Sequence, residues 1–127
     1  MGRIITRHYQ SDGGAVNIAL GGVPNVVVVI NLMATGSEDM VLIYFKDLLG
    51  EVQITAAGAI TWDASTGSIS QYDGNAVDTG TSNTDSDPCR VTGGQGITIA
   101  TGFQDDDDEI IVLAFFTDID DDLGDVA

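Results

Sequence analysis

The chain has 127 residues, a length typical of one domain with its own hydrophobic core. Its 20 Asp and Glu outnumber the four Lys and Arg, and the formal net charge at pH 7 is −16. Nucleic acids and anionic membrane surfaces attract proteins through Lys and Arg, so this balance argues against both kinds of partner.

The acidic composition has two explanations, and the sequence leaves both open. It resembles that of proteins from saline environments, including halophilic archaea and their viruses, where molar salt shortens the Debye length to about 3 Å and screens the repulsion. A soluble acidic domain from any host is the other explanation. The single cysteine, Cys89, excludes a disulfide within one chain and leaves burial or pairing between chains open.

The first part of the chain predicts strands. Residues 3–5 begin an N-terminal strand, and the apolar residues 26–34 and 40–47 predict a hairpin joined by the turn-forming residues 35–39. In both hairpin segments the apolar residues are consecutive rather than alternating. This pattern indicates strands that are covered on both faces, by the same chain or by a neighbouring subunit.

The middle of the chain alternates more clearly. Residues 51–63 predict two strands that are separated by a tight turn or a bulge at residues 56–58. Residues 64–90 are rich in Ser, Thr, Gly, Asn and Asp and predict a long polar loop, in which Ile69 and Tyr72 anchor one short strand.

The last part predicts strands at residues 96–103 and 109–116, on either side of a run of aspartates, and we interpret this segment as a second hairpin similar to the first. Residues 117–127 form an acidic tail. Strong helix formers are few, and residues 46–52 hold at most one helical turn. We therefore expect a single all-β domain over residues 1–127, a β-sandwich or small β-barrel of about seven or eight short antiparallel strands.

Two aspartate clusters are candidate calcium sites, because Ca²⁺ prefers several carboxylates on a loop. The candidate ligands are Asp105, Asp107, Asp118, Asp120 and Asp122. The second cluster only partly matches an EF-hand loop, since it lacks flanking helices and the last ligand. The alternative, which we favour, is a solvated turn and tail whose charges keep the apolar segment 110–116 from aggregating.

Motifs for catalysis are missing from the sequence. His8 is the single histidine, no serine lies in a G-x-S-x-G motif, and residues 93–96 lack the lysine of a phosphate-binding loop. One histidine without visible acid–base partners is typical of a structural residue. We therefore predict that the protein is not an enzyme, has no catalytic residues and needs no cofactor, with structural calcium as the alternative.

One segment resembles a known class of proteins. Gly96, Ile97, Thr98, Ile99 and Thr101, followed by residues 110–116, resemble the closing strands of structural proteins from tailed phages and related viruses. The resemblance implies a virion protein that is made in the host cytoplasm and resides on the capsid surface or the tail. It implies a capsid decoration or cement protein, with a tail or fibre subunit as the alternative.

The partners that this resemblance implies are other copies of the chain, as a trimer or another oligomer, and the major capsid protein or another virion protein. The apolar residues 26–30, 42–45 and 110–116 are the predicted core or contact residues. A calcium-dependent carbohydrate-binding module is the alternative from another class. In that case Trp62 and Tyr72 would stack on sugars and the aspartate-rich loops would bind the cation.

Overall fold

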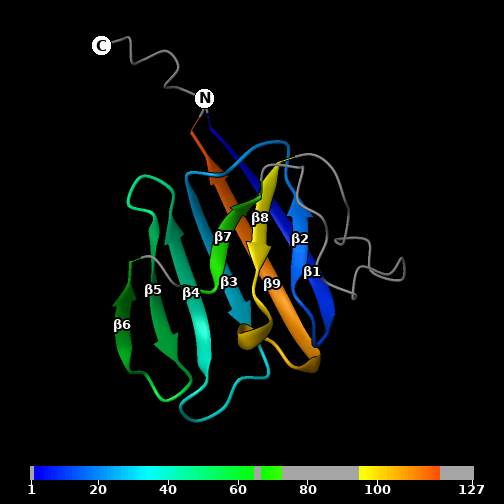
Figure 1. Ribbon diagram of the computed structural model, residues 1–127, viewed down its shortest axis with the longest axis vertical. Helices are drawn as coiled ribbons and strands as arrows, with labels where there is room; N and C mark the ends of the chain where they lie inside the picture. The colour runs from blue at the N-terminus through cyan, green and yellow to red at the C-terminus, as the bar shows by residue number, and fades with distance from the viewer. Residues whose placement is uncertain (1, 65–66, 73–94, 118–127) are drawn as a thin grey trace.

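The computed structural model describes residues 2–64, 67–72 and 95–117 and folds them into nine strands and one 3₁₀ turn, η1 (Figure 1). The elements are β1 (Arg3–Asp12), β2 (Val16–Ala19), β3 (Val26–Asn31), β4 (Asp39–Phe45), β5 (Gly50–Thr55), β6 (Ile60–Asp63), β7 (Ile69–Tyr72), β8 (Gly96–Ile99), η1 (Thr101–Phe103) and β9 (Asp106–Phe116).

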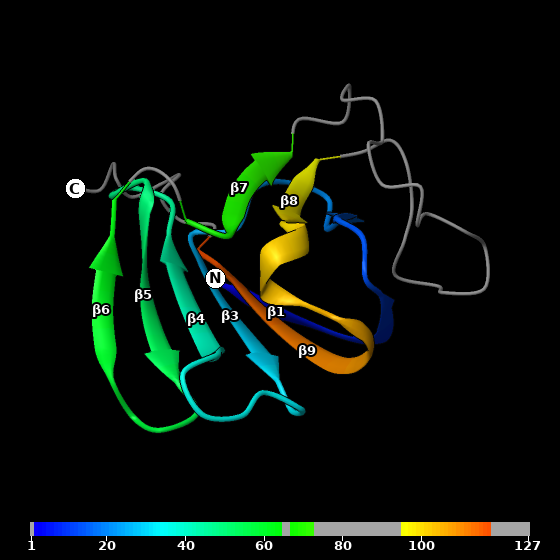
Figure 2. The ribbon, with the colours of Figure 1, turned by 60° about the horizontal axis from the view of Figure 1, so that its bottom comes forward.

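The strands form two antiparallel sheets that lie one over the other (Figure 2). The larger sheet has six strands in the order β1-β9-β3-β4-β5-β6, and the smaller has three in the order β2-β8-β7. The predicted all-β, sandwich-like fold is therefore confirmed. The expected strand count missed β2, a four-residue strand between glycine pairs at positions 13–14 and 21–22.

The core lies between the two sheets, and on β3, β4 and β9 buried residues that face this core alternate with more exposed residues on the opposite side. On β3, for example, Val27 and Val29 are fully buried, whereas Val26, Val28 and Ile30 are half-buried on the other face. The core residues are Tyr9, Val16, Ile18, Leu20, Val27, Val29, Leu42, Tyr44, Ile69, Ile97, Ile99, Phe103, Ile110, Val112, Ala114 and Phe116.

The first predicted hairpin is correct and the second is wrong. β3 pairs with β4, but β8 pairs with β2 and β7 in the small sheet while β9 pairs with β1 and β3 in the large one. The chain crosses between the sheets through η1 because Gln104 anchors the crossing in the core. Its side-chain oxygen accepts a hydrogen bond from the Tyr9 hydroxyl at 2.9 Å, and its amide donates to the Ile99 carbonyl.

Residues 46–52, for which the sequence allowed at most one helical turn, form the turn at residues 46–49 between β4 and β5 and the start of β5 at Gly50. The predicted polar loop 64–90 contains β7, as expected, but its residues 73–90 lie outside the described part of the chain, as do residues 118–127 of the predicted tail.

Candidate functional site

The candidate site is the side of the six-stranded sheet that faces away from the small sheet, here called the outer face. No described segment packs on it (Figure 2). Every strand of the large sheet contributes apolar side chains to it. These are Ile4, Val26, Val28, Ile30, Val41, Ile43, Phe45, Val52, Ile54, Ile60, Trp62, Ile111, Leu113 and Phe115.

The strand register aligns these side chains in rows that run across the sheet. The central row follows the cross-strand pairs Leu113–Val28, Val28–Ile43, Ile43–Val52 and Val52–Trp62. A second row runs through Ile111, Ile30, Val41, Ile54 and Ile60, and a third joins Ile4, Phe115, Val26 and Phe45. Because cross-strand neighbours touch side by side, the rows form one continuous apolar surface.

Exposure on the outer face is highest at its two edges. Ile4 on β1 is 62% exposed, and Ile60 and Trp62 on β6 are 69% and 49% exposed. The residues between them are half-buried by their lateral neighbours. The polar residues at outer-face positions lie on the β1 and β9 side, where the His8 ring nitrogen and a Glu109 carboxylate oxygen are 2.7 Å apart.

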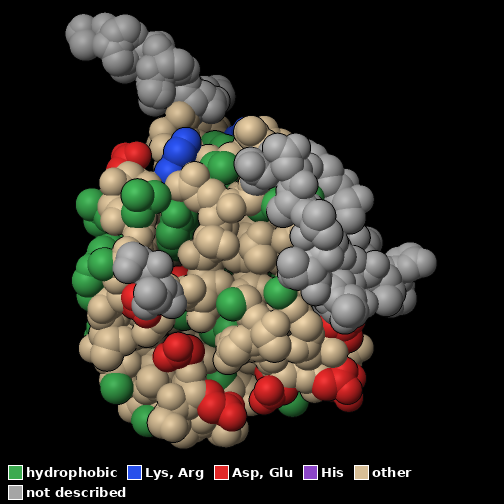
Figure 3. Space-filling model, in the orientation of Figure 1, with side chains coloured by type: hydrophobic (Ala, Val, Ile, Leu, Met, Phe, Trp, Pro, Cys, Tyr) green, Lys and Arg blue, Asp and Glu red, His purple; other side chains and the backbone are tan. Residues whose placement is uncertain are grey.

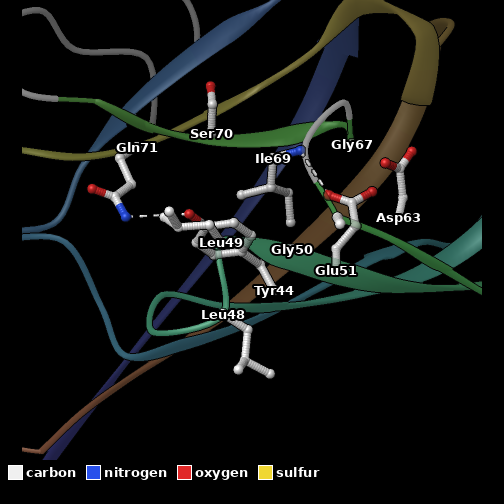
Figure 4. A pocket seen from close by; sticks show the side chains of 11 residues that line it. Tyr44, Leu48, Leu49, Gly50, Glu51, Asp63, Gly67, Ile69, Ser70 and Gln71 are labelled. Atoms are coloured by element: carbon white, nitrogen blue, oxygen red, sulfur yellow. Dashed lines mark hydrogen bonds between the residues drawn. The ribbon is translucent and has the colours of Figure 1, made fainter.

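A second feature is an open cavity of about 610 Å³ between β7 and the β4–β5 hairpin (Figure 4). Its floor includes the buried carboxylate of Glu51, which accepts hydrogen bonds from the backbone N–H groups of Ser68 and Ile69, each at 2.9 Å, and from Gln53 Nε2 at 2.8 Å. The Gln71 amide donates to the Tyr44 hydroxyl on the other side. The bonds to Glu51 tie the small sheet to the large one.

The rim of this cavity carries two exposed leucines. Leu48 and Leu49 are each 61% exposed, and Leu49 has a φ of 50°, in the left-handed region that a leucine rarely adopts. The next residue, Gly50, makes room for the indole ring of Trp62, because a Cβ there would lie 2.6 Å from Trp62 Cζ2.

The aspartate run is placed at one rim of the molecule, beside the turn that precedes β4. Acidic side chains gather along this rim in Figure 3. β9 begins within the run, at Asp106, so most of these acids belong to a strand end rather than to a turn. Asp107, with a φ of 73°, lies in the bulge where the pairing with β1 shifts.

The side chain of Asp108 has a structural role at this rim. Its Oδ2 accepts hydrogen bonds from Asn31 Nδ2 at 2.8 Å and from the Asp105 backbone N–H at 2.9 Å. Asp108 also lines a cavity of about 170 Å³ together with Asp105, Asp39 and Glu38. Burial raises the pKa of the Asp39 carboxyl above its usual value of 3.8.

Two of the predicted metal ligands, Asp105 and Asp107, lie within the described residues, and neither belongs to a group there that could hold a metal ion. In residues 2–64, 67–72 and 95–117, no group of three or more His, Cys, Asp or Glu side chains is placed to hold a metal ion. This covers Asp105 and Asp107. Asp118, Asp120 and Asp122 lie outside the described residues, as does Cys89.

The two aromatic residues of the alternative carbohydrate site are also separated. Trp62 lies on the outer face, whereas Tyr72 is 2% exposed and its ring is not available to stack on a sugar. The sequence did predict the apolar residues 26–30, 42–45 and 110–116. It did not predict the contribution of β5 and β6 to the outer face, although the alternation of residues 51–63 contains that signal.

Comparisons of the chain with models of protein families, with curated proteins and with solved structures found no match. Among the helical segments of the described residues, none has the length and apolar character needed to cross a membrane.

Proposed function

We propose that the protein is a structural subunit of a virion, a capsid decoration or cement protein that stabilises the shell through subunit contacts. The observation that supports this proposal is the outer face, a continuous apolar surface across six strands that no described segment covers. Monomeric soluble proteins rarely expose apolar patches of more than a few hundred Å², and larger ones mark interaction sites. Burial of this face between subunits is the mechanism of the proposed function.

The distribution of acids supports the same proposal. Acids on the described strands and turns lie mostly away from the outer face, at the ends of strands and on the cavity side, as Asp63 and Glu51 do. Such charges keep the dispersed subunit in solution while leaving the apolar rows of the contact surface uncharged. A sheet with a free apolar face and a charged periphery suits a protein that must stay dissolved until it assembles.

Quantitative mass spectrometry of purified virions from cells that carry the coding sequence tests the proposal. We expect the chain in the particles, in many copies per shell. A few copies per particle would favour the alternative, a tail or fibre subunit. Absence of the chain from the particles would contradict both.

A second experiment tests the mechanism. Shells that lack the protein are incubated with the purified chain or with the triple variant Val28→Thr, Ile43→Thr and Leu113→Thr. The three substitutions replace apolar side chains at the centre of the outer face with polar ones. Wild-type protein is expected to bind and to raise the disassembly temperature of the shell, and the variant to do neither. Equal binding by both proteins would show that shell binding does not depend on an intact outer face, whether that face contacts the shell or another subunit.

A further inference from the structure

We propose that the outer face is covered by a second copy of the same chain, so that two six-stranded sheets pack face to face in a twofold dimer. This inference names the partner and rests on the proposed function only in taking the outer face as the contact surface. Residues of the central row, among them Val28, Ile43 and Leu113, would lie in the middle of the dimer interface.

The size of the face supports a stable dimer. The three rows hold fourteen apolar residues, and each covers about 4.8 Å across the sheet and two residues of about 3.3 Å along its strand. The flat apolar area is therefore about 440 Å² per copy and about 900 Å² for two copies, before the relief of the side chains is added. Specific interfaces begin at about 1,000 Å² in total, so the apolar rows alone come close to this size.

The distribution of charge favours a second copy of the chain over a basic protein as the partner of the outer face. None of the described positions in the three apolar rows carries an acid, and Glu109, beyond Ile111 on β9, has the His8 ring beside it. Two copies can therefore meet through their centres without bringing carboxylates together, although each carries a net charge of −16. A basic partner would find its complementary charges at the aspartate-rich rim and not on this face.

The side chains of the face also suit packing against an identical sheet. Val, Ile and Phe dominate it, and aligned sheets interdigitate such side chains about 10 Å apart. In an isologous contact, both copies use the same surface, so the exposed edge residues Ile60 and Trp62 of each copy become buried. The remaining repulsion between two acidic molecules is long-range, and salt screens it.

Sedimentation velocity tests the dimer. Wild-type protein is examined over a range of concentrations at about 0.1 M and about 1 M NaCl, where the Debye length falls from about 10 Å to about 3 Å. The test variant is the triple threonine variant V28T/I43T/L113T, since threonine keeps the β-branched shape and strand propensity. The control, L48T, changes an exposed residue of the β4–β5 turn that lines the cavity and not the outer face.

We expect the wild type and the control to be dimers that strengthen with salt, and the triple variant to be a folded monomer. Circular dichroism checks that each variant keeps its β structure. A wild type that stays monomeric at all concentrations and in both salts would overturn the proposal, and so would a triple variant that dimerises as well as the wild type.

Cysteine cross-linking keeps the proposal falsifiable if the triple variant does not fold. In a Cys89→Ser background, Val28→Cys, Ile43→Cys and Leu113→Cys are oxidised one at a time, with Leu48→Cys as the control. We expect a disulfide-linked dimer from at least one outer-face position and none from Leu48→Cys. Cross-linking through Leu48→Cys alone would overturn the proposed geometry.

These outcomes are separate from those of the proposed function. A monomer that still binds shells through the outer face would overturn the second copy and leave the virion role in place. A dimer that forms through the outer face but is absent from virions would overturn the virion role and support the second copy.

Discussion

Phe45 and Trp62 lie on strands that are not neighbours, yet their ring centroids are 6.4 Å apart with an interplanar angle of 41°. The strand between them, β5, places Gly50 opposite Phe45, and the indole ring occupies the space that a side chain at Gly50 would need. The two rings therefore join β4 and β6 across a glycine and keep the outer face continuous at this edge.

Gly50→Ala tests this arrangement. The added Cβ would meet Trp62 at 2.6 Å and Asp63 O at 3.0 Å, so the ring must move. We expect a loss of about 1–3 kcal/mol in the free energy of unfolding, as for other overpacked sites. Urea denaturation measures it, with Gly102→Ala as the control, because a Cβ at Gly102 meets nothing within 4 Å.

A double-mutant cycle separates the ring contact from the backbone contact at Gly50. In a Trp62→Ala background most of the cost of Gly50→Ala should disappear. If the cost is the same with and without the indole ring, the clash with the Asp63 backbone dominates and our account of the ring is wrong.

Glu51→Gln tests the link between the sheets. The carboxylate accepts three hydrogen bonds, and an amide replaces one acceptor oxygen with a donor that faces another donor. We expect a loss of about 1–3 kcal/mol in stability and faster hydrogen exchange at the amides of Ser68 and Ile69. Asp47→Asn, in an exposed turn, is the control. Unchanged exchange at both amides would argue against the role of Glu51.

Leu49→Asn tests the backbone strain at the β4–β5 turn. Asparagine tolerates the left-handed conformation better than leucine, so the variant should gain up to about 1 kcal/mol of stability. Leu48→Asn, at an equally exposed neighbour without a positive φ, should bring no such gain. Thermal unfolding of the two variants measures the difference, and equal stabilities would contradict the interpretation.

Asp39→Asn tests the effect of burial on a carboxyl. The folded protein raises the pKa of Asp39 above 3.8, so the neutral form is favoured in the folded state and ionisation destabilises it. This contribution to stability is fully present below pH 3.8 and is lost as the pH rises through the raised pKa. We expect the variant to be more stable than the wild type at pH 7 and equal to it below pH 3.8, as followed by urea denaturation at each pH. If the variant remains more stable than the wild type below pH 3.8, the raised pKa of Asp39 does not explain the difference in stability.

The sequence predicted most of the strands because the apolar runs and the glycine- and aspartate-rich turns are local signals. The pairing of β8 was not predictable from them. Residues 96–103 and 109–116 look like the arms of a hairpin. The buried contact of Gln104 with Tyr9, which holds the crossing between the sheets in the core, connects residues far apart in the chain.

The candidate site was predicted only in part, because local patterns predict apolar strands but not how the strands pair. Consecutive apolar residues at positions 26–30 predicted strands covered on both faces, and the structure covers one face with the small sheet. The alternation of residues 51–63 indicates one apolar face on β5 and β6, but the joining of Ile54, Ile60 and Trp62 to the outer face depends on the strand order, which local patterns do not contain. The acids beside residues 110–116 were expected to form a turn, and the backbone bulge at Asp107 instead carries them into β9.

Acrylamide quenching of Trp62, the single tryptophan of the chain, tests most directly whether assembly buries the outer face. Trp62 is 49% exposed in the isolated chain, so dilute protein in low salt should emit at long wavelength and be readily quenched. At concentrations and salt where sedimentation shows assembly, we predict emission at shorter wavelength and weaker quenching. Equal quenching of Trp62 in the assembled and the dissociated protein would contradict the account.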